Sequence, residues 1–312
     1  MSEHMEIAPS SPVVDHVPAP ESKPKGFDVG VLIAFAKAVV ASPAFLPGLV
    51  VAAGLAACFW PLWPRLIDLW NSEDGYYSHG PIVPLISVFI IYKWWPRIKD
   101  TPVKFGIAGI PILLALLFVM YPANASKIEG LMALGLMAIV AVSVWIVAGW
   151  SWMWKLAAPI AYLAFGLPLW TTIINNTTNP LQQISTSVAY QLLKLSGFYV
   201  YQSDPTVIYM NSFVLNVEVA CSGLKLLLAL TAFTVFFVLI ARLKMWANVV
   251  AIALIPVFAL LVNGLRIALI GVVGETWGSD AGMKFHDYSG YITLIVCFVV
   301  LFKIFRLMGW KD

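Results

Sequence analysis

Three residues of the chain could together form a cysteine-nucleophile site. Cys221, Arg266 and His286 are distant in the sequence, and each lies near one end of a long apolar stretch. A thiolate is a strong nucleophile that a neighbouring cation favours. Histidine exchanges protons near neutral pH, and arginine stays charged and can hold a developing oxyanion. These residue types indicate nucleophilic catalysis if the fold brings them together.

Each of the three residues also has a simpler explanation. A cysteine near a helix end is usually a small packing residue, an arginine at a membrane edge can extend to the interface, and a histidine can be an ordinary loop residue. Their joint placement favours the functional interpretation, because ionisable groups near a membrane are costly to keep. Cys58 and Cys297 lie within apolar stretches and are expected to be core residues. Three scattered cysteines do not suggest a disulfide framework.

The composition places most of the chain in a membrane. Of its 312 residues, 61% are hydrophobic and 11% are charged, and the mean hydropathy is +0.87. In soluble domains about 25% of the residues are charged. The sequence has no basic nucleic-acid surface, no glycine-rich phosphate loop and no His, Cys or carboxylate cluster with metal-ligand spacing. We therefore expect no nucleic-acid partner, no cofactor and no metal.

Several apolar stretches reach the roughly 20 residues that a spanning helix needs. They predict an all-α polytopic membrane protein, in which residues 29–312 form a single transmembrane domain after a disordered cytoplasmic tail at 1–28. Residues 29–41 are expected to form an interfacial helix. The sequence shows no long internal repeat, which gives no support to a transporter with duplicated halves. About eight transmembrane helices are expected, at about 43–63, 79–95, 105–121, 130–149, 153–170, 222–241, 246–270 and 289–308.

The distribution of basic residues predicts the orientation. With the N-terminus inside, 12 Lys and Arg residues fall in cytoplasmic segments and 6 outside, with Lys37 uncounted. The positive-inside rule therefore predicts an inner (plasma) membrane protein with both termini in the cytoplasm. In this topology Cys221 opens the sixth span, Arg266 lies near the outer end of the seventh, and His286 lies in the loop before the eighth. All three are expected at the extracytoplasmic face.

One long extracytoplasmic insertion is expected, from about residue 171 to 220. Its first part predicts an amphipathic helix over about 180–196 that lies in the membrane interface. Asn179 can cap this helix, Pro180 fits its first turn and Gly197 can end it. Two β-rich stretches follow, 198–201 and 206–219, and predict a β-hairpin with a turn at Asn211-Ser212.

Three further residues are candidates for supporting or substrate-binding roles. Asn263 precedes Arg266 by three residues, so both point to similar sides of one helix. Asn263 could orient Arg266 by a hydrogen bond or could pack between helices. Tyr77 and His79 are expected at the same outer face, where they could line the cleft or be an interfacial tyrosine and a solvated histidine.

Four short motifs stand out in the sequence: VACSGL around Cys221, NGLRI around Arg266, HDYSG from His286 and YSHG at Tyr77. In order and spacing, over roughly residues 60–305, they resemble those of the exosortase/archaeosortase family. Lys225 follows the first motif where the family often has arginine. The resemblance implies a membrane-embedded cysteine protease or transpeptidase whose Cys, Arg and His chemistry is similar to that of sortases on an unrelated fold.

The resemblance also implies the partners. Such enzymes are thought to cleave C-terminal sorting signals such as PEP-CTERM, which consist of a short motif, a transmembrane helix and a basic tail. The substrates would be exported proteins anchored in the lipid bilayer, and the acceptor of the cleaved chain would be an amine or water.

Three other functions stay open. A transporter or channel would want ionisable residues buried in the middle of spans, and the predicted span centres are almost free of charge. A membrane transferase for polyprenyl-linked or glycan substrates could bind phosphate with Arg266 and His286 and would not need a thiol. A non-catalytic assembly factor for exopolysaccharide export would tolerate the loss of all three residues.

Overall fold

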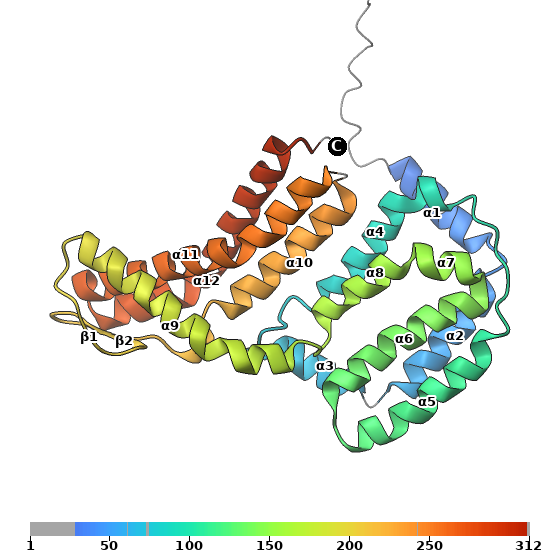
Figure 1. Ribbon diagram of the computed structural model, residues 1–312, viewed down its shortest axis with the longest axis horizontal. Coiled ribbons are helices and arrows are strands. Elements are labelled where there is room, and N and C mark those ends of the chain that lie inside the picture. Colours follow the sequence, from blue (N-terminus) through green and yellow to red (C-terminus); the bar gives the residue numbers. More distant parts are fainter. Residues whose placement is uncertain (1–28, 61, 73–74, 242, 311–312) are drawn as a thin grey trace, which may run out of the picture.

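The fold is almost entirely helical, with one small sheet (Figure 1). The computed structural model describes residues 29–60, 62–72, 75–241 and 243–310, so the predicted tail at 1–28 lies outside the described residues. Within these ranges four helices are long and apolar enough to cross a membrane, or up to six if each of two bent helix pairs forms one span. The chain is thus a polytopic helical membrane protein, but the predicted count of eight spans is not confirmed.

The first half of the chain forms a group of mostly short helices. Helices α5 and α6 pack side by side, and α1 and α2 meet at an angle of 84°. Phe59, Met120 and Ile139 lie in the core that α2, α5 and α6 share. The helices of this half are α1 (Val29–Val40), α2 (Phe45–Cys58), α3 (Leu62–Asn71), α4 (Ile82–Ile98), α5 (Gly109–Ala125) and α6 (Glu129–Ala148).

The span predicted at 153–170 is wrong as one continuous helix. The structure has three short pieces there, α7 (Trp150–Lys155), α8 (Ala157–Tyr162) and the 3-10 helix η1 (Leu163–Gly166). Pro159 explains the first break, because a proline clashes with the carbonyl four residues earlier, and α7 ends at that residue, Lys155. Leu167 is extended, as expected for the residue before Pro168.

The amphipathic helix exists but begins earlier than predicted. Helix α9 runs from Thr171 to Leu195, so Asn179 and Pro180 lie inside it rather than at its start. The carbonyl of Asn176, which Pro180 leaves without an amide donor, belongs to an exposed residue that water can reach. The predicted end is confirmed, since Gly197 has a φ of +85° directly after the helix.

A three-stranded antiparallel sheet replaces the predicted hairpin. Its strands β1 (Tyr201–Asp204), β2 (Val207–Tyr209) and β3 (Val214–Asn216) pair in sequence order. The Asn211-Ser212 turn joins β2 to β3, where both carboxylate oxygens of Glu275 accept a hydrogen bond from the Ser212 amide at 3.0 and 3.2 Å. Ile208 and Leu215 of the sheet are buried in one core with Leu193 and Ile267. The sheet is therefore fixed against α9 and α11.

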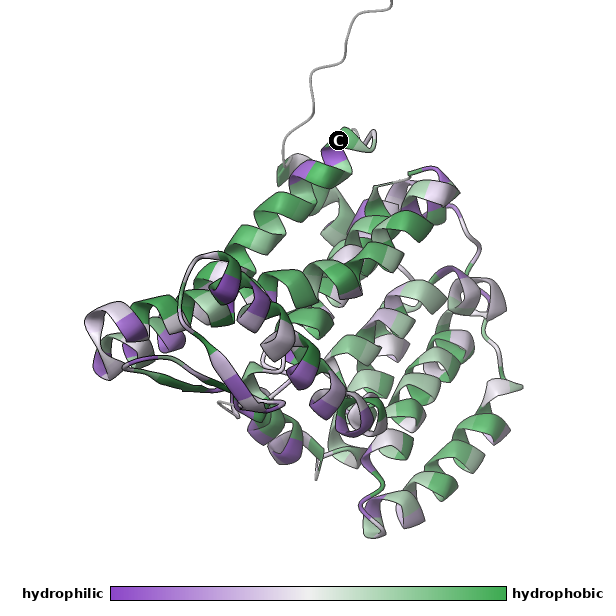
Figure 2. Cartoon of the chain, turned by 60° about the vertical axis from the view of Figure 1, so that its left-hand side comes forward, coloured by the Kyte–Doolittle hydropathy of each residue, from purple (hydrophilic) through white to green (hydrophobic). Residues whose placement is uncertain are grey.

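Three helices complete the chain: α10 (Leu224–Ile240), α11 (Met245–Trp277) and α12 (Ser279–Leu307). At 1.5 Å per residue, the 33 residues of α11 span about 50 Å, more than the roughly 30 Å of bilayer hydrocarbon. The helix is therefore longer than the hydrocarbon layer, and α9 and the sheet pack on its C-terminal part (Figure 1). Figure 2 shows polar residues concentrated on α9 and at helix ends, and apolar residues along the other helices.

Candidate active site

Cys221 lies in a single turn of 3-10 helix, η2 (Val219–Cys221), just before α10. Its amide donates to the Glu218 carbonyl at 2.9 Å, and its side chain is only 7% exposed. Gly223 then takes a left-handed conformation with a φ of +87°, which turns the chain into α10. The cysteine is therefore held rigidly at the N-terminal end of a helix, with its thiol facing the neighbouring helices.

His286 lies next to Cys221. Its Nε2 atom is 2.9 Å from the Cys221 sulfur, and its Nδ1 atom is 3.3 Å from a carboxylate oxygen of Asp287. The imidazole is one-third exposed, with 33% of its side-chain surface open. The predicted loop position of His286 is wrong, because α12 already begins at Ser279, after Gly278 with its φ of +89°. The histidine is thus carried by a continuous helix.

Arg266 holds the histidine segment in place through two hydrogen bonds. Its Nε donates to the Ser289 hydroxyl at 2.9 Å, and its Nη2 donates to the His286 carbonyl at 3.2 Å. The Ser289 hydroxyl donates to the same carbonyl at 3.1 Å. Arginine has five N–H donors, so those on Nη1 and the second one on Nη2 are free of partners among the described residues and can serve a ligand.

Ser289 belongs to the site although no role was predicted for it within the HDYSG motif. It lies three residues after His286 and is 4% exposed, so both face the same side of α12. That spacing is a usable signal only once His286 is known to be helical, whereas the sequence predicted a loop at this histidine.

Asn263 does not orient Arg266. Its side-chain amide donates to the carbonyl of Cys221 at 2.8 Å, and the residue is 1% exposed. On this part of α11, Asn263 faces the turn before α10, while Arg266 faces α12. The polar role expected for Asn263 exists, but it acts on the cysteine backbone.

The turn at Gly223 gives a stability prediction. A Cβ atom there would lie 2.9 Å from the Asn263 amide nitrogen, whereas a Cβ at Gly197, which has nearly the same φ, would meet nothing within 4 Å. Gly197→Ala therefore measures the left-handed backbone cost alone, about 1–2 kcal/mol. We expect Gly223→Ala to lower the melting temperature of the detergent-solubilised protein clearly more than Gly197→Ala does. Equal shifts would contradict the close packing of Asn263 on this turn.

Tyr77 packs beside the start of α10, and His79 follows it by two residues. The buried Tyr77 hydroxyl accepts a hydrogen bond from the Trp170 amide at 3.1 Å, and its ring packs in one cluster with Ile174 and Leu224. Burial lowers the pKa of His79, although a hydrogen bond to the Phe165 backbone opposes this shift. Within the described residues, no hydrogen bond joins either side chain to Cys221, Arg266 or His286. Their expected place in the cleft therefore stays a prediction.

The three central residues lie at one height along their helices. Cys221 is 19 residues from the end of α10 at Ile240. Arg266 is 21 residues from the start of α11 at Met245. His286 is 21 residues from the end of α12 at Leu307. The ends of α10 and α12 lie together, since the Phe237 ring is 5.0 Å from both Phe305 and Trp310, and α11 begins at Met245, shortly after α10 ends at Ile240. At 1.5 Å per residue the site is about 30 Å from them, which is the thickness of the bilayer hydrocarbon.

Cys297 is the other cysteine whose side chain is described. It is buried at 1% exposure among Leu230, Ile255 and Leu301, as expected for a core residue. The side chain of Cys58 lies outside the described residues.

Comparison with known proteins identifies a family. The family model for transmembrane exosortases matches residues 70–303, which include all the residues of the site. No curated protein and no solved structure matches the chain significantly. Because the match spans most of the chain, the chain belongs to the transmembrane exosortase family.

Proposed function

We propose that this exosortase is a cysteine peptidase or transpeptidase that cleaves the C-terminal sorting signals of exported proteins. The observation that carries the proposal is the 2.9 Å contact between the Cys221 sulfur and His286 Nε2, beside an arginine with free donors. A thiol within hydrogen-bond reach of a base, with the base held by further groups, is the arrangement that activates a nucleophile.

The first half of the reaction forms an acyl-enzyme. The contact with Asp287 favours the proton of neutral His286 on Nδ1, which leaves Nε2 free to accept the thiol proton. The Cys221 sulfur attacks the scissile carbonyl, and the free N–H groups of Arg266 stabilise the oxyanion. The C–N bond then breaks, and the leaving amine takes the proton from His286. The product is a thioester on Cys221.

The second half releases the acyl group. Water or an amine enters the site, and His286 accepts a proton from it as it attacks the thioester carbonyl. The C–S bond breaks and the proton returns to the Cys221 sulfur, which restores the resting pair. Water gives hydrolysis and an amine gives transpeptidation.

The site would lie at the outer face of the inner membrane, with both chain termini in the cytoplasm. The site lies about 30 Å from the C-terminal ends of α10 and α12, and this distance supports the placement. Two segments predicted to be cytoplasmic also meet, where Lys155 Nζ donates to the Thr101 hydroxyl at 2.6 Å. The basic residues of these segments would then follow the positive-inside rule.

A substrate anchored by its own C-terminal helix would meet this site without leaving the membrane. Its helix would cross beside α10, α11 and α12, its basic tail would stay in the cytoplasm, and its sorting motif would reach the outer interface. Helix α9 and the sheet pack on the C-terminal part of α11 and would shape the cleft there.

The proposal is tested by following a candidate substrate in cells that lack the native gene. The substrate carries its short motif, apolar helix and basic tail, with an epitope tag at the C-terminus. We expect loss of the tag only when this chain is expressed, and no loss when the apolar helix of the substrate is deleted. An intact tag in the presence of well-expressed protein would favour the transferase or assembly-factor alternatives.

A further inference from the structure

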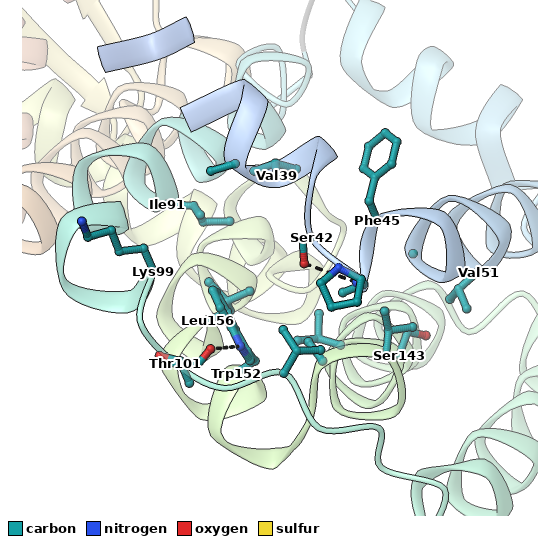
Figure 3. A pocket seen from close by; sticks show the side chains of 18 of the residues that line it. Val39, Ser42, Phe45, Val51, Ile91, Lys99, Thr101, Ser143, Trp152 and Leu156 are labelled. Carbon is teal, nitrogen blue, oxygen red and sulfur yellow. Dashed lines mark hydrogen bonds between the residues drawn. The ribbon is translucent and has the colours of Figure 1, made fainter. Parts of the chain in front are cut away.

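A second site lies in the other half of the molecule, far along the chain from the cysteine. A cavity of about 790 Å³ opens where α1 bends into α2 (Figure 3). Its walls come from α1, α2, α4, α6 and the segment from Trp152 to Leu156. The site described above uses α10, α11, α12 and the turn before α10. The cavity therefore has no part in the proposed reaction.

The cavity is apolar along most of its length. Val39, Val51 and Ile91 line it together with other aliphatic and aromatic side chains (Figure 3). Apolar cavities of only about 150 Å³ take up small hydrocarbons rather than water, and ligand sites usually measure about 300–1,000 Å³. Its size and lining therefore fit a long hydrocarbon chain.

One end of the cavity is polar and carries net positive charge. Lys99, Asp100 and Thr101 line this rim, and Lys155 reaches it through its 2.6 Å hydrogen bond to the Thr101 hydroxyl. This end thus has two ammonium groups, those of Lys99 and Lys155, and one carboxylate, that of Asp100. In the predicted topology this rim lies at the cytoplasmic surface, where basic pockets between helices bind anionic head groups.

The wall on the α1 side offers a way in from the bilayer. Helix α1 has no buried residue, and Phe35 makes edge contacts to the Tyr92 and Trp95 rings at 5.7 and 5.0 Å. At the bend, the Ser42 hydroxyl accepts a hydrogen bond from the Ala44 amide (Figure 3). Because no residue of α1 is buried, this helix forms only an outer wall of the cavity, and a lipid chain could enter beside it.

We propose that this cavity binds one anionic phospholipid, with an acyl chain between α1, α2, α4 and α6 and its phosphate beside Lys99 and Lys155. The apolar cavity matches the acyl chain of such a lipid. The basic rim, at the expected level of the lipid head groups, matches its phosphate. This site is independent of the proposed cleavage chemistry.

Two glycines of α2 give a matched test. Gly48 lines the cavity, and a Cβ there would lie 3.9 Å from Val147, another lining residue, while a Cβ at Gly54 would meet nothing within 4 Å. Gly48→Leu therefore fills the cavity and Gly54→Leu does not. The full-length proteins are incubated with vesicles of equal parts phosphatidylglycerol and phosphatidylethanolamine and extracted, and bound lipid is measured by native mass spectrometry.

We expect wild type and Gly54→Leu to retain one phosphatidylglycerol, and Gly48→Leu to retain at least fivefold less. Equal melting temperatures of the two variants show that both are folded. Retention by Gly48→Leu at the wild-type level, or no bound lipid on wild type, would overturn the proposal.

A charge variant tests the head group separately and does not depend on filling the cavity. Lys99→Gln should reduce the preference for phosphatidylglycerol over phosphatidylethanolamine about fivefold. Lys303→Gln removes the same charge from α12, away from the cavity, and should leave the preference unchanged. An equal effect of both substitutions, or of neither, would contradict a phosphate at the rim.

Discussion

Replacing Cys221 by alanine should abolish substrate cleavage, with a loss of at least about 10³-fold. The thiol is the only group at the site that the mechanism uses to form a covalent bond, and neither His286 nor Arg266 can replace it. The loss is measured by blotting for the C-terminal tag of the substrate, in cells that express wild type or Cys221→Ala at equal levels in the membrane.

Cys297→Ala is the matched control for this experiment. The side chain is buried in the core of α10, α11 and α12, so its removal costs some packing but touches no group at the site. We expect cleavage by Cys297→Ala to stay near the wild-type rate. If Cys221→Ala cleaves as fast as wild type, Cys221 is not the nucleophile and the proposed mechanism is wrong.

His286→Gln should slow cleavage by about 10²–10⁴-fold, which is the usual contribution of general acid–base catalysis. Glutamine has a similar length and can form hydrogen bonds, but it cannot exchange a proton near neutral pH. The main-chain carbonyl at position 286 still accepts its bond from Arg266, so the arginine keeps its place. The rate is measured with the same tagged substrate.

Asp287→Asn is the comparison for His286→Gln. Its carboxylate is 70% exposed and only 3.3 Å from Nδ1, so an amide oxygen can replace it as the acceptor. We expect less than about a tenfold loss, since exposed charge pairs contribute little. A larger loss from Asp287→Asn than from His286→Gln would mean that the carboxylate carries the essential proton transfer.

The convergence of Cys221, Arg266 and His286 could be predicted from sequence because each lies near one end of a long apolar stretch, and consecutive stretches alternate in direction. Apolar length locates each stretch approximately, although α11 and α12 extend beyond the predicted span edges. The structure brings the three residues together as the sequence predicted: Cys221 contacts His286, and Arg266 donates to the His286 carbonyl.

Two features were not predicted, one because hydropathy was followed over local backbone chemistry and one because it depends on tertiary packing. Pro159 breaks a stretch that is apolar enough to span, and hydropathy alone does not register a lost amide donor. Asn263 and Arg266 lie three residues apart, yet one serves α10 and the other α12. Spacing along one helix says which side a residue faces but not which neighbour it meets there.

The histidine is part of a helix that is long and apolar enough to cross a membrane, and the arginine is part of another. Each residue added to an α-helix rotates everything beyond it by about 100°. One residue inserted into α12 between Ser289 and Leu307 would therefore rotate His286 away from the thiol, if the part of the helix between the insertion and Leu307 stays packed. The alignment of the catalytic groups thus depends on the rotation of each helix about its own axis. An insertion between the end of α10 and the start of α11 lies outside both helices and would leave this rotation unchanged.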